Sequence, residues 1–240
     1  MLTKTAWIRA LGLVLILAAM LTFLLEPVDL QQGQHGPDGI NYLSQLHSLL
    51  FDQDLLLYNN DDLVAKRTIA TSTGYALELH NIGTALAFLP FYALGTLTCR
   101  LGGAACDIAS QPIGAWLSLG NWMYGLLAIA VLFRLAERYA PRQWAAVAVA
   151  AVVLGSPFLY YWTRFFNPHM PSLLLIALLV LIWGRTQDSR RWHHWLLMGA
   201  LGGLATTVAS YNGILLLLPA ADLLQSVRRR RLAVVGDGLV

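Results

Sequence analysis

Carboxylate side chains, which proteins use as proton acceptors and as ligands for divalent cations, concentrate in one polar stretch of this sequence. Eight of the thirteen acidic residues lie between positions 26 and 80. Among them, Asp38 stands directly before a run of apolar residues at helical spacing. Two interpretations of Asp38 are open. It is a general base whose pKa is raised by partial burial at an apolar boundary, or it is the N-cap of the following helix.

Asp52 and Asp54 form a D-x-D pair in the segment FDQDL. Two carboxylates at this spacing can hold a divalent cation between them. A solvated helix end or turn accounts for the same residues without a ligand, and we favour it. These 240 residues also contain no phosphate-binding loop, no dinucleotide fingerprint and no cluster of histidines and cysteines. We therefore expect neither a metal nor another cofactor.

Cationic side chains that can hold a phosphate occur at two places. Arg164 lies within the aromatic segment YYWTRFF, and its guanidinium can clamp a phosphate group through two hydrogen bonds. The alternative for Arg164 is a side chain that reaches lipid headgroups within a belt of aromatic residues. Lys66 and Arg67 offer a second phosphate site, although an exposed basic pair in a loop is usually only solvated.

Polar residues at the edges of the apolar segments are candidates for contacts with a substrate. His169 and His80 stand where a polar group is costly, and each either binds a substrate group or is satisfied by water at an interface. Tyr211 and Asn212 either line a cleft or close a turn between two helices. Asn167, beside a proline at the start of an apolar segment, belongs to the same candidate set.

The composition indicates what kind of scaffold must hold these residues. Of the 240 residues, 57% are hydrophobic and 12% are charged, and the mean hydropathy is +0.58. Charged residues make up roughly 25% of soluble domains. The values exclude an ordinary cytosolic enzyme, a disordered tail and a fibrous repeat, and they predict an integral membrane protein. The net charge of +3 does not indicate a nucleic-acid partner, because the basic residues lie between apolar blocks.

The apolar blocks predict an all-α, polytopic bundle in a single transmembrane domain, residues 1–240, with about six spans. The expected spans lie at about 7–25, 113–133, 144–163, 170–184, 192–209 and 213–226. Residues 26–111 form a long outer loop after the first span, with an amphipathic helix at 39–51. Within this loop, the apolar segment 82–97 is only sixteen residues long and contains Pro90, so we favour a juxtamembrane helix over a span.

Basic residues in the connections predict the orientation of the bundle. Ten arginines fall on one side when 82–97 is not counted as a span: Arg134, Arg138, Arg142, Arg185, Arg190, Arg191 and Arg228 to Arg231. The positive-inside rule makes that side cytoplasmic and places the N-terminus there too. The outer loop, the Asn167–His169 corner and the Ser210–Asn212 corner then face outward. Asp222 faces the cytoplasmic side, near enough to Arg228 to pair with it.

Four segments together resemble a known family: PDGINYLSQLHSLLFDQDL, HNIGTALAFLPFYALG, GSPFLYYWTRFFNPHMPSLLLIALLVLIW and WLLMGALGGLATTVASYNGILLLLPAADLL. In this order they resemble the N-terminal half of bacterial GT-C glycosyltransferases, relatives of the protein O-mannosyltransferases and the lipid A aminoarabinose transferases. The resemblance implies a membrane enzyme that takes a sugar from a polyprenyl-phosphate carrier. Because family members are commonly longer, it also implies that this chain is a fragment of a longer protein.

The resemblance also assigns roles to particular residues. The family's first outer loop begins with an acidic residue shortly before an aromatic one. Asp38 and Tyr42 take this place, as catalytic base and substrate-binding residue. The sequence departs from these relatives twice. In the relatives an acidic residue precedes the proline at the start of an apolar segment, and here Asn167 takes that place before Pro168. The relatives also commonly have a basic residue near the polar connection between the last two apolar segments, and residues 209–212 of this chain contain none.

We therefore expect an inverting membrane glycosyltransferase that moves a sugar to an acceptor at the outer face of a bacterial inner membrane. Its expected partners are a polyprenyl-phosphate-linked sugar and membrane lipid. The alternative, favoured by the two departures, is a non-catalytic membrane subunit in lipid-carrier or envelope-glycan assembly.

Overall fold

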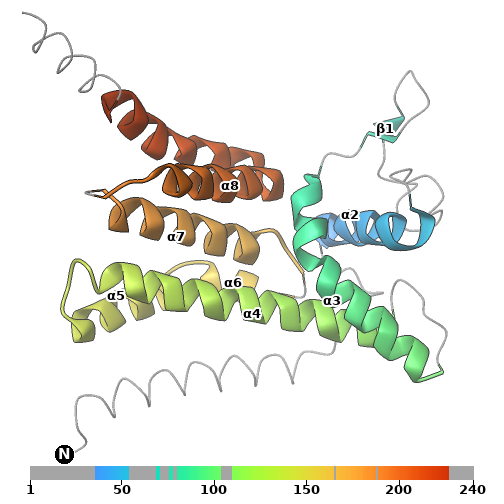
Figure 1. Ribbon diagram of the computed structural model, residues 1–240. Helices are drawn as coiled ribbons and strands as arrows, with labels where there is room; N and C mark the ends of the chain where they lie inside the picture. The colour runs from blue at the N-terminus through green and yellow to red at the C-terminus, as the bar shows by residue number, and fades with distance from the viewer. Residues whose placement is uncertain are drawn as a thin grey trace, which may run out of the picture.

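The computed structural model describes residues 36–53, 69–70, 76–77, 80–103, 110–164, 166–187 and 189–226 (Figure 1). Its elements are, in chain order, α2 (Gly36–His47), the π-helix η1 (Ser48–Asp52), β1 (Ile69–Ala70), β2 (Ala76–Leu77), α3 (Ile82–Leu101), α4 (Gln111–Ala136), α5 (Arg142–Gly155), α6 (Phe158–Thr163), α7 (His169–Arg185), α8 (Trp192–Val208), the 3₁₀-helix η3 (Ser210–Leu216) and a helix at 217–226. The expected span at 7–25 lies outside the described residues, as do Asp54, Lys66 and Arg67.

The described part of the chain is helical apart from one short antiparallel ladder, in which Ile69 lies opposite Leu77. The prediction of a helical fold is therefore confirmed. By length and composition, two of the described helices can cross a membrane, namely α3 and α4. The apolar helices α5 and α7 have 14 and 17 residues, fewer than the roughly 20 that a span needs. The structure thus does not confirm six spans.

The body of the bundle consists of α4, α7 and α8, which lie side by side (Figure 1). α5 and α6 pack against α4, whereas α2 and α3 lie at the end where α7 begins and α8 ends. One hydrophobic cluster joins α2, α3 and α4 around Leu46, Phe88 and Leu117. A second cluster joins α4, α5, α6 and α7 around Trp162. α2 is thereby attached to the bundle through its apolar face, as the amphipathic pattern predicts.

The expected span at 144–163 is not one continuous helix, and the structure does not confirm it as a span. The helix is interrupted between α5 and α6, where Ser156 adopts an extended conformation. Pro157 explains the interruption, because proline lacks an amide hydrogen and disfavours a helical conformation in the preceding residue. After the break, the Trp162 indole is fully buried and donates a hydrogen bond to the Trp122 carbonyl at 3.1 Å.

α3 is longer than the apolar segment that the sequence indicates, because it continues to Leu101 and keeps Pro90 in its interior. It has the length and composition of a span, and its juxtamembrane placement stays a prediction. Its first turn contacts α8 closely: a Cβ atom added at Gly83 would overlap the backbone of Thr207. Membrane helices approach in this way at small residues, where backbones come into van der Waals contact. The absence of a side chain at Gly83 therefore allows the first turn of α3 to pack directly against the last turn of α8.

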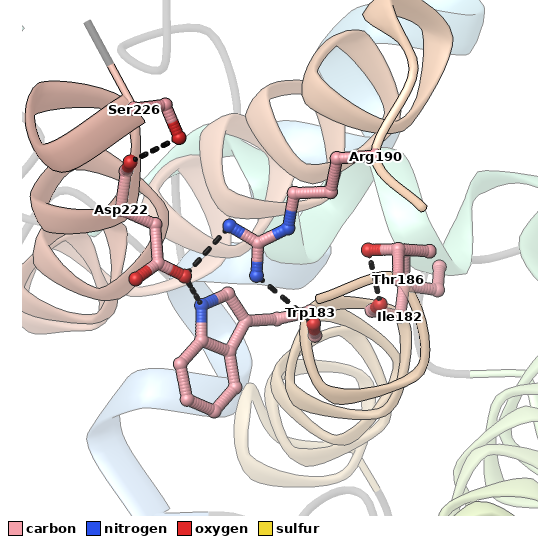
Figure 2. Close-up of polar contacts among 6 residues, drawn as sticks. All are labelled: Ile182, Trp183, Thr186, Arg190, Asp222 and Ser226. Atoms are coloured by element: carbon pink, nitrogen blue, oxygen red, sulfur yellow. Dashed lines mark hydrogen bonds and ion pairs between the residues drawn. The ribbon is translucent and has the colours of Figure 1, made fainter. Parts of the chain in front are cut away.

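At the opposite end of the bundle, an ion pair joins the α7–α8 connection to the helix at 217–226 (Figure 2). Arg190 Nη1 lies 2.6 Å from Asp222 Oδ2, and the Trp183 indole donates to the same oxygen at 2.7 Å. Arg190 Nη2 also donates to the Trp183 carbonyl at 3.1 Å. Sequence proximity pointed to Arg228 as the partner of Asp222. Among the described residues the partner is Arg190, and Arg228 lies outside them.

Candidate functional site

Several of the predicted site residues meet at one end of the bundle, where α7 begins and α8 ends (Figure 1). The Tyr42 ring of α2 lies 5.1 Å from the His80 ring and 5.8 Å from the Phe166 ring, centroid to centroid. Asn81, which precedes α3, donates a hydrogen bond to Ser210 Oγ at 2.7 Å. We call this cluster the polar end; its described residues are 38–45, 80–84, 164, 166–169 and 210–212.

α2 brings the candidate base to the polar end. Because this helix begins at Gly36, Asp38 lies in its first turn and not at the N-cap position. Tyr42 follows one turn later on the same face of the helix, since residues four apart are neighbours along an α-helix. Tyr42 is buried, and its ring contacts His80 and Phe166. Position 38 therefore lies one turn before Tyr42 along α2.

His80 is held by two amide side chains of α2. Asn41 Nδ2 lies 3.0 Å from His80 Nδ1, and Gln45 Nε2 donates to the His80 carbonyl at 3.0 Å. In the described part of the chain, Asn41 Oδ1 and Gln45 Oε1 are buried without a hydrogen-bond partner. Such acceptors carry a desolvation cost that a donor group from a ligand would relieve.

The segment before α7 is fixed by two asparagines. Asn121 Nδ2, in the middle of α4, donates to three carbonyls within residues 161–164 at 2.8 to 2.9 Å. Asn167 donates to the Tyr161 carbonyl at 2.7 Å and accepts from the His169 amide at 3.0 Å. Asn167 thus shapes this turn with its own side chain. Asn121 was not among the residues predicted from the sequence. A lone asparagine within an apolar segment is the signal that could have identified it.

Arg164 and His169 each lie against a tyrosine ring. The Arg164 guanidinium carbon stands 4.6 Å from the centroid of Tyr160, a cation–π distance. The His169 ring lies 3.8 Å from the ring of Tyr161. Both Arg164 and His169 are half-buried, and Tyr160 is exposed. The guanidinium therefore lies near the molecular surface, where both interpretations of Arg164 place it.

Tyr211 and Asn212 of η3 have different environments. Tyr211 is 66% exposed, whereas Asn212 is 3% exposed. Asn212 Nδ2 donates to Ser172 Oγ at 2.5 Å and to the Ala205 carbonyl at 2.9 Å, so it joins η3 to α7 and α8. These contacts match the turn-closing interpretation of Asn212. Of this pair, Tyr211 is the one that a ligand can reach.

An apolar pocket of about 260 Å³ lies beside the polar end, between α3, α4, α7 and α8. Its lining includes Gly83, Ala87, Pro171, Leu175, Leu204 and Val208. Two of these residues, Gly83 and Val208, are close neighbours of Asn81 and Ser210 in sequence. An apolar lining favours a hydrocarbon group over a sugar. The polar end and an apolar pocket are therefore adjacent.

The D-x-D pair can be followed in the structure only at Asp52. This residue is exposed at the end of η1, and Ser48 Oγ lies 3.5 Å from its carboxylate. Over the residues that the structure describes, no three histidines, cysteines or acids come together as ligands for a metal ion.

Comparison with known protein families matches residues 114–235, just over half of the chain, to the dolichyl-phosphate-mannose-protein mannosyltransferase family. The matched region begins in α4 and includes the segment before α7 and η3. Neither the curated proteins nor the solved structures include a match. Together with the apolar helices α3 and α4, the family match indicates a membrane protein. The chain belongs to the dolichyl-phosphate-mannose-protein mannosyltransferase family, within the GT-C superfamily of glycosyltransferases.

Proposed function

We propose that this protein is an inverting glycosyltransferase that moves a sugar from a polyprenyl-phosphate carrier to an acceptor at the outer face of the membrane. The observation that carries the proposal is the polar end with its adjacent apolar pocket. A lipid-linked sugar phosphate has the same two parts, a polar head and a hydrocarbon chain. Membership of a family named for a polyprenyl-type phosphate sugar supports this class of donor.

In this proposal, Asp38 accepts the proton of the acceptor hydroxyl, and the hydroxyl oxygen attacks the anomeric carbon from the face opposite the phosphate. The bond between that carbon and the phosphate oxygen breaks, and its electron pair leaves with the polyprenyl phosphate. Arg164, assisted by Lys66 and Arg67, holds the departing phosphate through charge-assisted hydrogen bonds. The protein thus supplies a base, an anion site and a fixed orientation.

The contacts separate the remaining candidates into two groups. Asn167 and Asn212 are positioning residues, because their amide groups already bind neighbouring turns. His80, His169 and Tyr211 are proposed to contact the substrate.

α2 contributes two further groups to the proposed site. Asn41 Oδ1 and Gln45 Oε1 are buried acceptors that the hydroxyl groups of a sugar can satisfy. Tyr42 positions these residues, because its ring is packed between His80 and Phe166. The sugar would therefore be recognised mainly by the helix that carries Asp38.

A non-catalytic membrane subunit in lipid-carrier or envelope-glycan assembly is the second candidate function. The observation that favours it is Asn167, which takes the place of an acid in the relatives and uses its side chain to shape a turn. Such a subunit would bind the lipid carrier in the apolar pocket without transferring the sugar.

Filling the apolar pocket is expected to weaken the use of a lipid-linked donor. In Ala87→Phe the added ring occupies space in the pocket that the hydrocarbon chain of the donor would fill. If about two methylene groups of that chain lose their contacts with the pocket, KM for the donor rises roughly tenfold. The measurement is transfer from polyprenyl-phosphate sugars in proteoliposomes. Ala93→Phe is the matched control, because Ala93 is an exposed residue of the same helix outside the pocket lining.

The same assay decides between the two candidate functions. Transfer by the wild type with a selective KM effect of Ala87→Phe supports the enzyme. Binding of the carrier without transfer of any tested sugar supports the subunit. An equal KM in both variants and the wild type would show that the pocket does not hold the donor chain.

A further inference from the structure

The end of the bundle opposite the polar end carries a second surface with its own chemistry. The α4–α5 connection is joined there to the last turn of α7, because Arg138 Nη2 donates to the Gly184 carbonyl at 2.9 Å. The ion pair between Arg190 and Asp222 attaches the helix at 217–226 to the same end (Figure 2). Three parts of the chain that are distant in sequence are thus held in fixed positions relative to one another.

We call this surface the basic rim and define it as residues 134–144 and 184–192. The sequence of these two ranges contains six arginines and two acids. One of the two acids, Asp188, lies outside the described residues. Glu137 lies 3.2 Å from Arg134 and 3.6 Å from Arg142, and these two arginine side chains remain 67% and 68% exposed. One acid shared by two exposed guanidinium groups leaves the α4–α5 connection positive.

The α7–α8 connection adds positive charge to the rim. Arg185 and Arg191 are exposed, and neither forms an ion pair with an acid in the described part of the chain. Arg190 is different, because its side chain is only 10% exposed and is bound to Asp222 and Trp183. Arg190 therefore holds the connection in place, whereas Arg185 and Arg191 present their charge to the surroundings.

Exposed aromatic rings stand among these cations. Tyr139 and Trp192 are each 76% exposed, and Trp144 is 60% exposed. Large rings with a polar edge are favoured at the boundary between hydrocarbon and lipid headgroups, where one part is apolar and another is hydrated. Their position at the ends of apolar helices matches this boundary.

We propose that the basic rim binds the phosphate groups of anionic phospholipids in the adjoining leaflet. A guanidinium fork fits a phosphate through paired hydrogen bonds. A cation near an anionic membrane surface strengthens the attraction by roughly fivefold for each residue. The aromatic rings fix the depth of the rim at the headgroup level. An anionic lipid surface accounts for both features, because its phosphates bind the cations and its interfacial region takes up the rings.

The test is the thermal unfolding midpoint of the whole chain in vesicles of phosphatidylcholine, with and without phosphatidylglycerol. We expect a higher midpoint with phosphatidylglycerol, and loss of most of this increase at high salt, because exposed charges are screened. In the double variant Arg185→Gln, Arg191→Gln the increase is expected to disappear. Its midpoint in phosphatidylcholine alone should equal that of the wild type, since neither side chain pairs with a described acid.

Arg100→Gln is the matched control, because Arg100 is an exposed cation at the end of α3, near the opposite end of α4. This variant should keep the full increase. An equal midpoint of the wild type in both vesicles would overturn the proposal, and so would a double variant that keeps the increase. Loss of the increase in Arg100→Gln would indicate a general charge effect and would also overturn it. A midpoint raised by duplex DNA or an acidic peptide, but not by phosphatidylglycerol, would assign the rim to another partner.

Discussion

Asp38→Asn is expected to lower the rate of sugar transfer in proteoliposomes by a factor of roughly 100 to 10,000. The asparagine amide has nearly the same shape as the carboxylate but cannot accept the proton of the acceptor hydroxyl. The fold should be retained, because Asp38 lies in the first turn of α2 and the helix is attached to the bundle through residues further along, such as Leu46. Affinity for the donor should change little, since the cations that bind phosphate are intact.

Asp52→Asn is the matched control for this experiment. Asp52 is an exposed carboxylate in the helical segment that follows α2, and the proposed mechanism gives it no role. Transfer by this variant should equal that of the wild type. Full activity of Asp38→Asn would remove Asp38 from the mechanism. Loss of activity in Asp52→Asn that excess Mg²⁺ restores would instead support a metal site at the D-x-D pair.

Gly83→Ala is expected to lower the free energy of unfolding by about 3 kcal/mol, near the upper end for overpacked sites. The added Cβ atom would overlap the backbone of Thr207, and a backbone cannot move aside as the tip of a side chain can. α3 must therefore shift away from α8, and the contact between Asn81 and Ser210 is lost with it. Transfer activity should fall in the variant that remains folded, because the polar end is displaced.

The matched control is Gly203→Ala, at a helical position of α8 where an added Cβ meets nothing within 4 Å. Alanine is the better helix former by about 1 kcal/mol, so this variant should be as stable as the wild type or more stable. Thermal unfolding of both variants in the same detergent measures the difference. Equal stability of the two variants would show that α3 does not approach α8 at Gly83.

The amphipathic helix α2 could be predicted from the sequence because its apolar residues recur at helical spacing. Leu43 and Leu46 are buried in α2, as this spacing requires. The sequence placed Tyr42 and His80 in the same loop, and their rings lie 5.1 Å apart in the structure. The predicted ends of this helix were less accurate. The sequence predicted a start at residue 39, after Pro37, whereas α2 begins at Gly36 and includes Pro37 in its first turn.

Contacts between distant parts of the chain could not be predicted, because no periodic pattern encodes them. Asn121 is a polar residue in an apolar helix, but its partners lie about 40 residues further along, on a segment that changes direction after Pro157. In the same way, Asp222 was placed with a neighbour in sequence, whereas antiparallel packing of α7, α8 and the helix at 217–226 brings it to Arg190. Each of these contacts follows from packing, which a single sequence does not show.

The most direct test of a shared outer face is the labelling of single cysteines in intact cells with a membrane-impermeant maleimide. In a chain whose Cys99 and Cys106 are replaced by alanine, the exposed positions Asp52 and Tyr211 are changed to cysteine one at a time. Both should be labelled from outside. Cysteine at Tyr139, an exposed position of the basic rim, should be labelled only after the membrane is permeabilised. Labelling of positions 52 and 211 from opposite sides would contradict a common site at the polar end.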